Sequence, residues 1–249
     1  VSERFLWDVR MTVNELLVEN YAGHFRALAK RHGMRLSIEA YGDGPYDDLT
    51  YAGQADEPMG EFWSWAKFGA ANSCTEMASA AHVYGKPIVG AEAFTATNLE
   101  KWLGHPGNIK DLGDWAFCEG INRFVFHTFA HQFLGTEYKP GISFGPYGVH
   151  WHRNQTWWPM VSAYHQYISR YSHMMQQGQG VSDILYLTPE GAPMVFNPPA
   201  DALFKNGAIP DKKGYGFDGC SPLMLMERAD VENGKIVFPG ASSYEIMVL

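Results

Sequence analysis

The chain has 249 residues, of which 46% are hydrophobic and 18% are charged, and this composition excludes a disordered protein. The formal net charge is −8 and no run of basic residues occurs, so we expect no nucleic acid as a partner. No apolar stretch reaches about 18 residues, so we also expect no segment that spans a membrane.

Neither the cysteines nor the ends of the chain indicate the cellular compartment of the protein. Cys74, Cys118 and Cys220 lie far apart without a CxxC pair, which indicates packing residues and leaves the compartment open. The chain carries no signal peptide, but it starts at Val1 and ends on the strand-like segment 245–249. We therefore expect it to be cut from a longer protein.

Apolar periodicity, with glycine and proline at the boundaries, predicts strands that alternate with helices. The predicted strands cover residues 34–40, 59–63, 87–93, 122–128 and 181–187. The predicted helices cover residues 11–32, 72–84, 108–119 and 155–177. Two long loops, 41–58 and 129–154, follow strands and are of a length that is usually functional or mobile.

This alternation predicts an α/β fold with a parallel sheet. We count about five βα units, whereas a (β/α)8 barrel of the TIM type has eight, so we expect an incomplete barrel over residues 1–190. Residues 191–249 are predicted to form a loop-rich region that leads into a second α/β unit. An incomplete barrel leaves strand edges unpaired, which favours association into a homo-oligomer.

Three glutamates lie on or beside successive predicted strands: Glu39, Glu61 and Glu92. Active sites of α/β barrels gather at the carboxyl ends of the strands, so three such residues suggest carboxylate chemistry at one edge of the sheet. A single one of them could equally be a solvated loop residue.

The first long loop contains Asp43, Asp47 and Asp48, which could bind a hard cation such as calcium. Their spacing differs from that of an EF-hand loop, and we favour a solvated acidic turn.

Histidines and aromatic residues gather in the loops. His127, His131, His150 and His152 could hydrogen-bond hydroxyl groups of a ligand or could be ordinary polar loop residues. No HExxH and no GxxxxGKS or GxxxxGKT sequence occurs, which argues against zinc protease chemistry and a P-loop nucleotide site. The 14% aromatic content suits a sugar-binding cleft or a large core. Trp157 and Trp158 are adjacent, so they cannot share one helix face.

Four segments together resemble glycoside hydrolase family 106, the bacterial α-L-rhamnosidases: residues 56–63, 78–95, 127–132 and 153–158. The similarity runs from about residue 19 to 249. It implies a (β/α)8 barrel, inversion at the anomeric carbon, a calcium ion near the sugar, further domains on both sides and a secreted or periplasmic location. A carboxylate that the family draws from an earlier part of the barrel would lie before Val1.

The resemblance assigns Glu61 and Glu92 to the acid and base pair, in an order that stays open, and makes Glu39 a third candidate. Burial against neighbouring aromatic rings, Phe62, Trp63 and Phe94, is expected to raise one pKa of the pair. Further residues are expected to bind the sugar: Tyr41, Asp56, Trp63, His127, His131, His150, Arg153 and Trp157.

The predicted function is therefore an exo-acting glycosidase that releases a terminal rhamnose from a plant or microbial glycan or glycoside. Two alternatives remain open, a sugar-binding barrel fragment without catalysis and a glycosidase for galactosides or glucosides.

Overall fold

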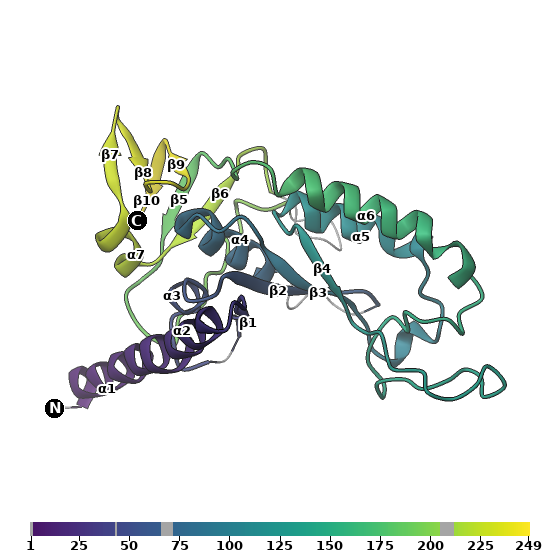
Figure 1. Cartoon of the computed structure of the whole chain (residues 1–249). Helices are drawn as coiled ribbons and strands as arrows, with labels where there is room; N and C mark the ends of the chain where they lie inside the picture. The colour runs from purple at the N-terminus through teal and green to yellow at the C-terminus, as the bar shows by residue number, and fades with distance from the viewer. Residues whose placement is uncertain (1, 43, 66–71, 205–211) are drawn as a thin grey trace.

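The computed structural model describes residues 2–42, 44–65, 72–204 and 212–249. In these residues the chain is a mixed α/β protein with helices packed between and beside parallel sheets (Figure 1). The predicted α/β class with a parallel sheet is confirmed. The described strands form separate sheets and do not close into a barrel.

The first sheet contains four parallel strands in sequence order: β1 (Ser37–Glu39), β2 (Glu57–Trp63), β3 (Gly90–Thr95) and β4 (Arg123–Phe126). All four lie where strands were predicted, although the observed bounds are shifted and β1 and β4 are shorter. Because the strands are parallel, their carboxyl ends meet at one edge of the sheet.

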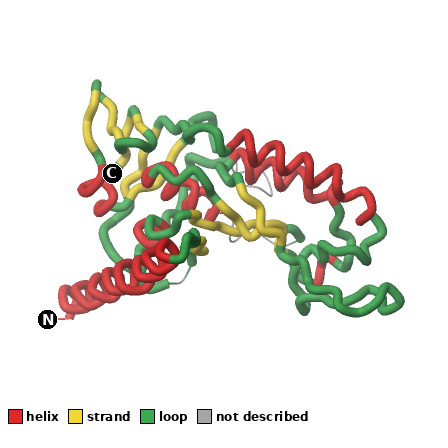
Figure 2. Tube along the Cα trace, in the orientation of Figure 1, coloured by secondary structure: helices red, strands yellow, loops and turns green. Residues whose placement is uncertain are grey.

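The helices that accompany this sheet are α1 (Ser2–Leu16), α2 (His24–Arg31), α3 (Asp48–Ala52), α4 (Asn72–Tyr84), α5 (Pro106–Cys118) and α6 (Val161–Met175). A π-helical segment, Leu17–Gly23, joins α1 to α2, and short 3-10 turns occur at Asn98–Glu100 and Trp158–Met160. Figure 2 shows the segment between β4 and α6 as a long loop that extends away from the sheets. No helix in the described part of the chain is long and apolar enough to span a membrane.

Two helical features differ from the prediction. The first helix begins at Ser2, whereas its predicted start was residue 11. Residues 2–10 are all exposed, including the large apolar side chains of Phe5, Leu6, Trp7 and Val9. The expected loop 41–58 contains α3, whose first turn is capped by the Asp47 side chain.

The fifth predicted strand is present but belongs to a different sheet from the first four. β5 (Ile184–Leu187) lies between β10 (Ile246–Val248) and β6 (Phe217–Cys220) in a second parallel sheet, and it does not extend β4. By its pairing β5 belongs with strands beyond residue 190. A third, antiparallel sheet contains β7 (Asp230–Glu232), β8 (Lys235–Val237) and β9 (Ser243–Tyr244), and α7 (Pro222–Arg228) precedes it.

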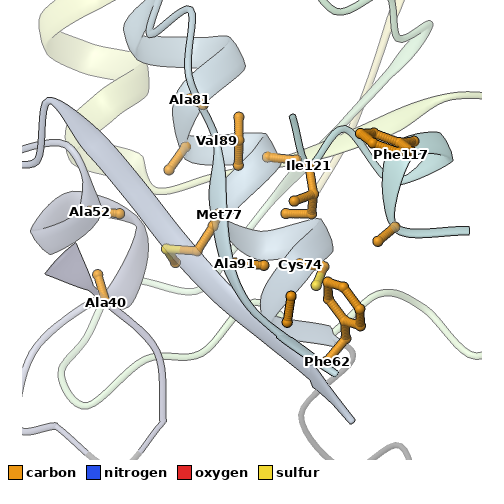
Figure 3. Close-up of a cluster of buried hydrophobic side chains, with 14 of the residues drawn as sticks. Ala40, Ala52, Phe62, Cys74, Met77, Ala81, Val89, Ala91, Phe117 and Ile121 are labelled. Carbon is orange, nitrogen blue, oxygen red and sulfur yellow. The ribbon is translucent and has the colours of Figure 1, made fainter. Parts of the chain in front are cut away.

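Helix α4 lies between the two parallel sheets, against β2 on one side and β6 on the other. The helix buries mostly small side chains, alanines, serines, a cysteine and a threonine, together with the larger Glu76, Met77 and Val83. Figure 3 shows Cys74, Met77 and Ala81 of α4 among the core side chains, with Phe62 of β2 nearby. On the β6 side, His82 Nδ1 lies 3.0 Å from the buried Asp218 carboxylate.

The closest approach of α4 to the first sheet occurs at Gly60. A Cβ atom at this position would lie 2.8 Å from the Ser73 carbonyl group and 2.9 Å from Cys74 N. No real Cβ occupies such a space without moving backbone atoms. Glycine is therefore required here because it lets the backbones of α4 and β2 touch.

We predict that Gly60→Ala lowers the free energy of unfolding by about 1–3 kcal/mol, because the added methyl group pushes α4 away from β2. Urea denaturation measures the change. Gly178→Ala is the matched control, since a Cβ at Gly178 would have no atom within 4 Å, and it should change stability by less than about 0.5 kcal/mol. Equal stability of the two variants would contradict the contact.

Candidate active site

Glu61 and Glu92 lie directly opposite each other on β2 and β3. Residues in register on neighbouring parallel strands point to the same face of the sheet. Glu39 of β1 is in register with Met59, two residues before Glu61, and so belongs to that face as well. We call this side of the first sheet the carboxylate face; Phe62 and its neighbours on the opposite side pack against α4 and α5.

The backbone at Glu61 is held by the first turn of α4. The Ser73 hydroxyl accepts a hydrogen bond from Glu61 N at 2.9 Å and donates one to Glu61 O at 3.2 Å. The Cys74 thiol also donates to Glu61 O, at 3.4 Å. Because β1 ends opposite Met59, the Ser73 side chain satisfies backbone groups that the neighbouring strand no longer reaches.

Glu92 is positioned by an irregularity in β3. The register shifts after Phe62, so that Trp63 pairs with Thr95 and Phe94 becomes an extra residue with a φ of 63°. This bulge turns Phe94 into the core and returns Thr95 to the carboxylate face. The Thr95 hydroxyl then donates a hydrogen bond to Glu92 Oε1.

His127, directly after β4, lies next to the same carboxylate. Its Nδ1 is 3.9 Å from Glu92 Oε1, and this nitrogen is buried without a hydrogen-bond partner among the described residues. This distance is too long for a hydrogen bond. The unpaired imidazole nitrogen is therefore free to hydrogen-bond a ligand that binds beside Glu92.

Tyr41 and Glu39 complete the polar group. The Tyr41 hydroxyl hydrogen-bonds Glu61, and burial together with the charges of Glu61 and Glu39 raises the pKa of Tyr41, so the phenol stays protonated. Partial burial of the Glu39 carboxyl raises its pKa, and the negative charges of Glu92 and Glu61 raise it further. Three carboxylates therefore interact electrostatically on one face, as acid–base chemistry requires. The rings of Phe62 and Phe94, which were expected to bury one member of the pair, lie in the core instead.

Two aromatic residues of the 129–154 loop lie beside this group, and the sequence analysis did not single them out. The Tyr147 ring stands edge-on to Trp63 at 6.1 Å, and the Phe144 ring stands edge-on to His127 at 5.6 Å. Both remain largely exposed, 45% and 61%. Aromatic residues between the glycines of a loop that follows a strand were the signal that could have identified them.

Known proteins resemble this chain in sequence and in fold. The family model of glycoside hydrolase family 106, described as alpha-L-rhamnosidase, matches residues 1–249. The chain belongs to this family. A rhamnosidase from Novosphingobium sp. PP1Y has a similar structure, with a TM-score of 0.87 and 28% identity over 99% of the present chain.

A curated relative from Formosa agariphila, named putative beta-glucuronidase, is 37% identical over 251 residues and covers the whole chain. The chain spans 20% of the length of that relative and 23% of the solved rhamnosidase chain. The present family 106 chain thus corresponds to a limited part of each protein.

Among the predicted sugar-binding residues of this family 106 chain, His150 lies apart from the carboxylate group. Its ring stacks on Trp102 at 3.8 Å, and its Nε2 lies 3.6 Å from Glu100. Burial lowers the pKa of His150, so the imidazole is neutral near pH 7. Trp102 and His150 come from the loops after β3 and β4, the same edge of the sheet as His127.

Asp56 is not brought to the carboxylate group. It precedes β2, at the amino end of the strand, where it accepts a hydrogen bond from Leu36 N at 2.9 Å and pairs with Arg26 at 3.4 Å. Its position in sequence, five residues before Glu61, places it at the opposite edge of the sheet.

The remaining predicted residues have contacts within the loop after β4. Arg153 donates hydrogen bonds to Gln132 O and Leu134 O, at 2.7 and 2.9 Å, and so closes the loop. Trp157 packs on Trp151 at 4.6 Å. His131 is exposed, with Phe133 as its ring neighbour at 5.9 Å.

The acidic loop is not a solvated turn. Asp47 and Asp48 are buried, the first capping α3 through Thr50 and the second accepting a hydrogen bond from Gly42 N at 3.0 Å. Asp43 lies outside the described residues. The prediction failed because capping and burial depend on α3, which the sequence analysis had assigned to a loop.

Metal binding by this loop finds no support. Among the described residues, no group of three or more His, Cys, Asp or Glu side chains is placed to hold a metal ion. The buried aspartates instead face Glu76, whose pKa is raised to about 9 by burial and by Asp48. A carboxyl that is protonated near pH 7 is a poor ligand for calcium.

The interaction between the three carboxylates leads to a prediction. Glu92→Gln and Glu61→Gln should each lower the pKa of Glu39, with the larger effect from Glu92→Gln, because each removes a negative charge that opposes ionisation of Glu39. A ¹³C NMR titration of the carboxyl groups measures it. Glu232→Gln, in exposed β7, is the control and should leave Glu39 unchanged. Unaltered titration of Glu39 in both site variants would show that the three groups do not interact.

Proposed function

We propose that this chain carries carboxylates of an exo-acting, inverting α-L-rhamnosidase that releases terminal rhamnose from a plant or microbial glycan or glycoside. The observation that carries the proposal is the register of Glu61 with Glu92, by which the two residues are neighbours on one face of a parallel sheet. Membership in the alpha-L-rhamnosidase family supports the choice of sugar.

Glycoside hydrolysis needs one carboxylic acid that protonates the leaving oxygen and one carboxylate that either activates water or attacks the sugar. We assign Glu61 and Glu92 to this pair and leave their order open. Hydrogen bonds from Tyr41 to Glu61 and from Thr95 to Glu92 orient the two groups. Glu39 is the third candidate, because its raised pKa favours the protonated form that an acid needs.

The proposed inversion places a water molecule between the base and the sugar, which needs carboxyl groups about 6.5–9.5 Å apart, against about 5–5.5 Å for retention. Residues in register on adjacent strands start about 4.8 Å apart, and glutamate rotamers can increase the separation of their carboxyl groups. Glu61 hydrogen-bonds Tyr41 and Glu92 hydrogen-bonds Thr95, and these different partners favour a larger distance between the two carboxyl groups.

We further propose that the first sheet is a section of a (β/α)8 barrel. Four parallel strands in sequence order, helices on one face and carboxylates on the other support it. In this proposal Trp63, His127, Phe144 and Tyr147 line the sugar site, and His150 lies at its rim.

Other elements of the proposal rest on the family alone: a calcium ion, a secreted or periplasmic location and association with further copies. No catalytic step depends on calcium, and metal analysis of the purified protein tests its presence. A second function, hydrolysis of glucuronides, follows from the name of the Formosa relative, and a third is sugar binding without catalysis. A panel of aryl rhamnosides, glucuronides, galactosides and glucosides separates these candidates.

We predict that Glu61→Gln and Glu92→Gln each lower kcat on an aryl α-L-rhamnoside by at least about a hundredfold, the usual scale for losing an acid or a base. Steady-state kinetics in the full natural protein measure the effect. Glu137→Gln, in the loop after β4, is the matched control and should keep the normal rate.

Near-normal rates in either site variant, with thermal unfolding unchanged, would remove that residue from the mechanism. Inactivity of the unaltered protein on the whole panel, together with measurable sugar binding, would favour the binding function.

A further inference from the structure

A cleft of about 830 Å³ lies at the amino ends of β1, β2 and β3. Its walls come from α2, from the turns before β1 and β2 and from the turn Tyr84–Pro87 that follows α4. This is the edge of the sheet opposite to Glu61 and Glu92, so the cleft is separate from the candidate active site.

The charge of this cleft is opposite to that of the molecule. Four basic side chains line it, Arg26, Lys30, Arg35 and Lys86, and Asp56 is the one acidic residue in its described lining. The whole chain has a net charge of −8, so a concentration of cations at one place is not an average property of the surface.

The available acids neutralise only part of this charge. Asp56 interacts with Arg26 at 3.4 Å, and Glu57 forms an ion pair with Arg35 at 2.9 Å. Lys86 forms no ion pair with any described residue, and Lys30 likewise has none. Among the described residues, the ammonium groups of Lys30 and Lys86 are therefore not paired with a carboxylate at ion-pair distance.

The positive charges of Arg26 and Arg228 act on Lys86. Burial, as the largest cause, and the charges of Arg26 and Arg228 together lower the pKa of Lys86 to about 8, although the charge of Asp56 acts in the opposite direction. The Tyr84 ring lies between two of these groups, with Arg228 4.9 Å and Lys86 5.9 Å from its centroid. The Arg228 Nε is buried and has no hydrogen-bond partner in the described part of the chain.

We propose that this cleft binds a small oxyanion group, a sulfate, phosphate or carboxylate, between Arg26 and Lys86. An anion there removes the repulsion between the two cations and supplies the acceptor that Lys86 lacks. The volume of the cleft has room for a sugar-sized molecule that bears such a group, so the anion can come from an acidic sugar or from a free inorganic ion.

The test is calorimetric titration and thermal unfolding of the full chain with sodium sulfate, against sodium chloride at the same ionic strength. We expect a saturable rise in Tm with sulfate only, since a ligand that binds the folded state stabilises it. Lys86→Gln should weaken sulfate binding at least tenfold. Arg170→Gln removes an equal charge from exposed α6 and should leave binding unchanged.

A second measurement does not depend on a variant. NMR titration of ¹³C-methylated lysines should show that sulfate raises the pKa of Lys86 toward the ordinary lysine value. Glucuronate and glucose identify the source of the anion: tighter binding of glucuronate than of sulfate assigns an acidic sugar, and equal or weaker binding assigns the free ion. Absence of saturation with sulfate and glucuronate, or equal affinity in Lys86→Gln, would overturn the site.

Discussion

The backbone contact between α4 and β2 at Gly60 is the constraint on which the candidate active site depends. Glycine allows the helix to approach closely enough for Ser73 to hydrogen-bond both backbone groups of Glu61. The same helix packs on β6 through its other side. One packed helix thereby connects the two parallel sheets and fixes the strand that carries the first carboxylate.

On the carboxylate face burial and repulsion between like charges act in the same direction on Glu39, and burial is the larger of the two. Glu39, Glu61 and Glu92 lie close enough for two of them to raise the pKa of the third. The hydroxyl groups of Tyr41 and Thr95 hydrogen-bond Glu61 and Glu92, respectively. A bulge at Phe94, with a backbone conformation that bulky residues rarely adopt, supplies one of these donors by turning Thr95 to that face. The strained backbone of Phe94 and the three interacting glutamates thus lie together at the proposed catalytic site.

The sequence predicted a helix or strand well where an apolar pattern was bounded by residues that typically end such an element. Helix 72–84 was predicted with its observed bounds, because apolar residues fill it and Gly85 follows it. The position of β3 beside β2 also follows from their order in the chain, because consecutive strands of an α/β protein are usually neighbours. The pairing of β5 with β6 and β10 could not be predicted, because it depends on contacts between segments far apart in the chain. Asp56 was misplaced for a simpler reason: a residue before a strand and a residue near its end are close in sequence but lie at opposite edges of the sheet.

The central claim is that two carboxylates on adjacent strands act as a separate acid and base, with a water molecule as the nucleophile. The most direct test is a proton NMR time course of the hydrolysis of an aryl α-L-rhamnoside by the full natural protein. The account predicts that β-L-rhamnose forms first and then equilibrates, because water attacks from the face opposite to the leaving group. First formation of α-L-rhamnose would contradict it, since retention requires a covalent intermediate on one of the two glutamates.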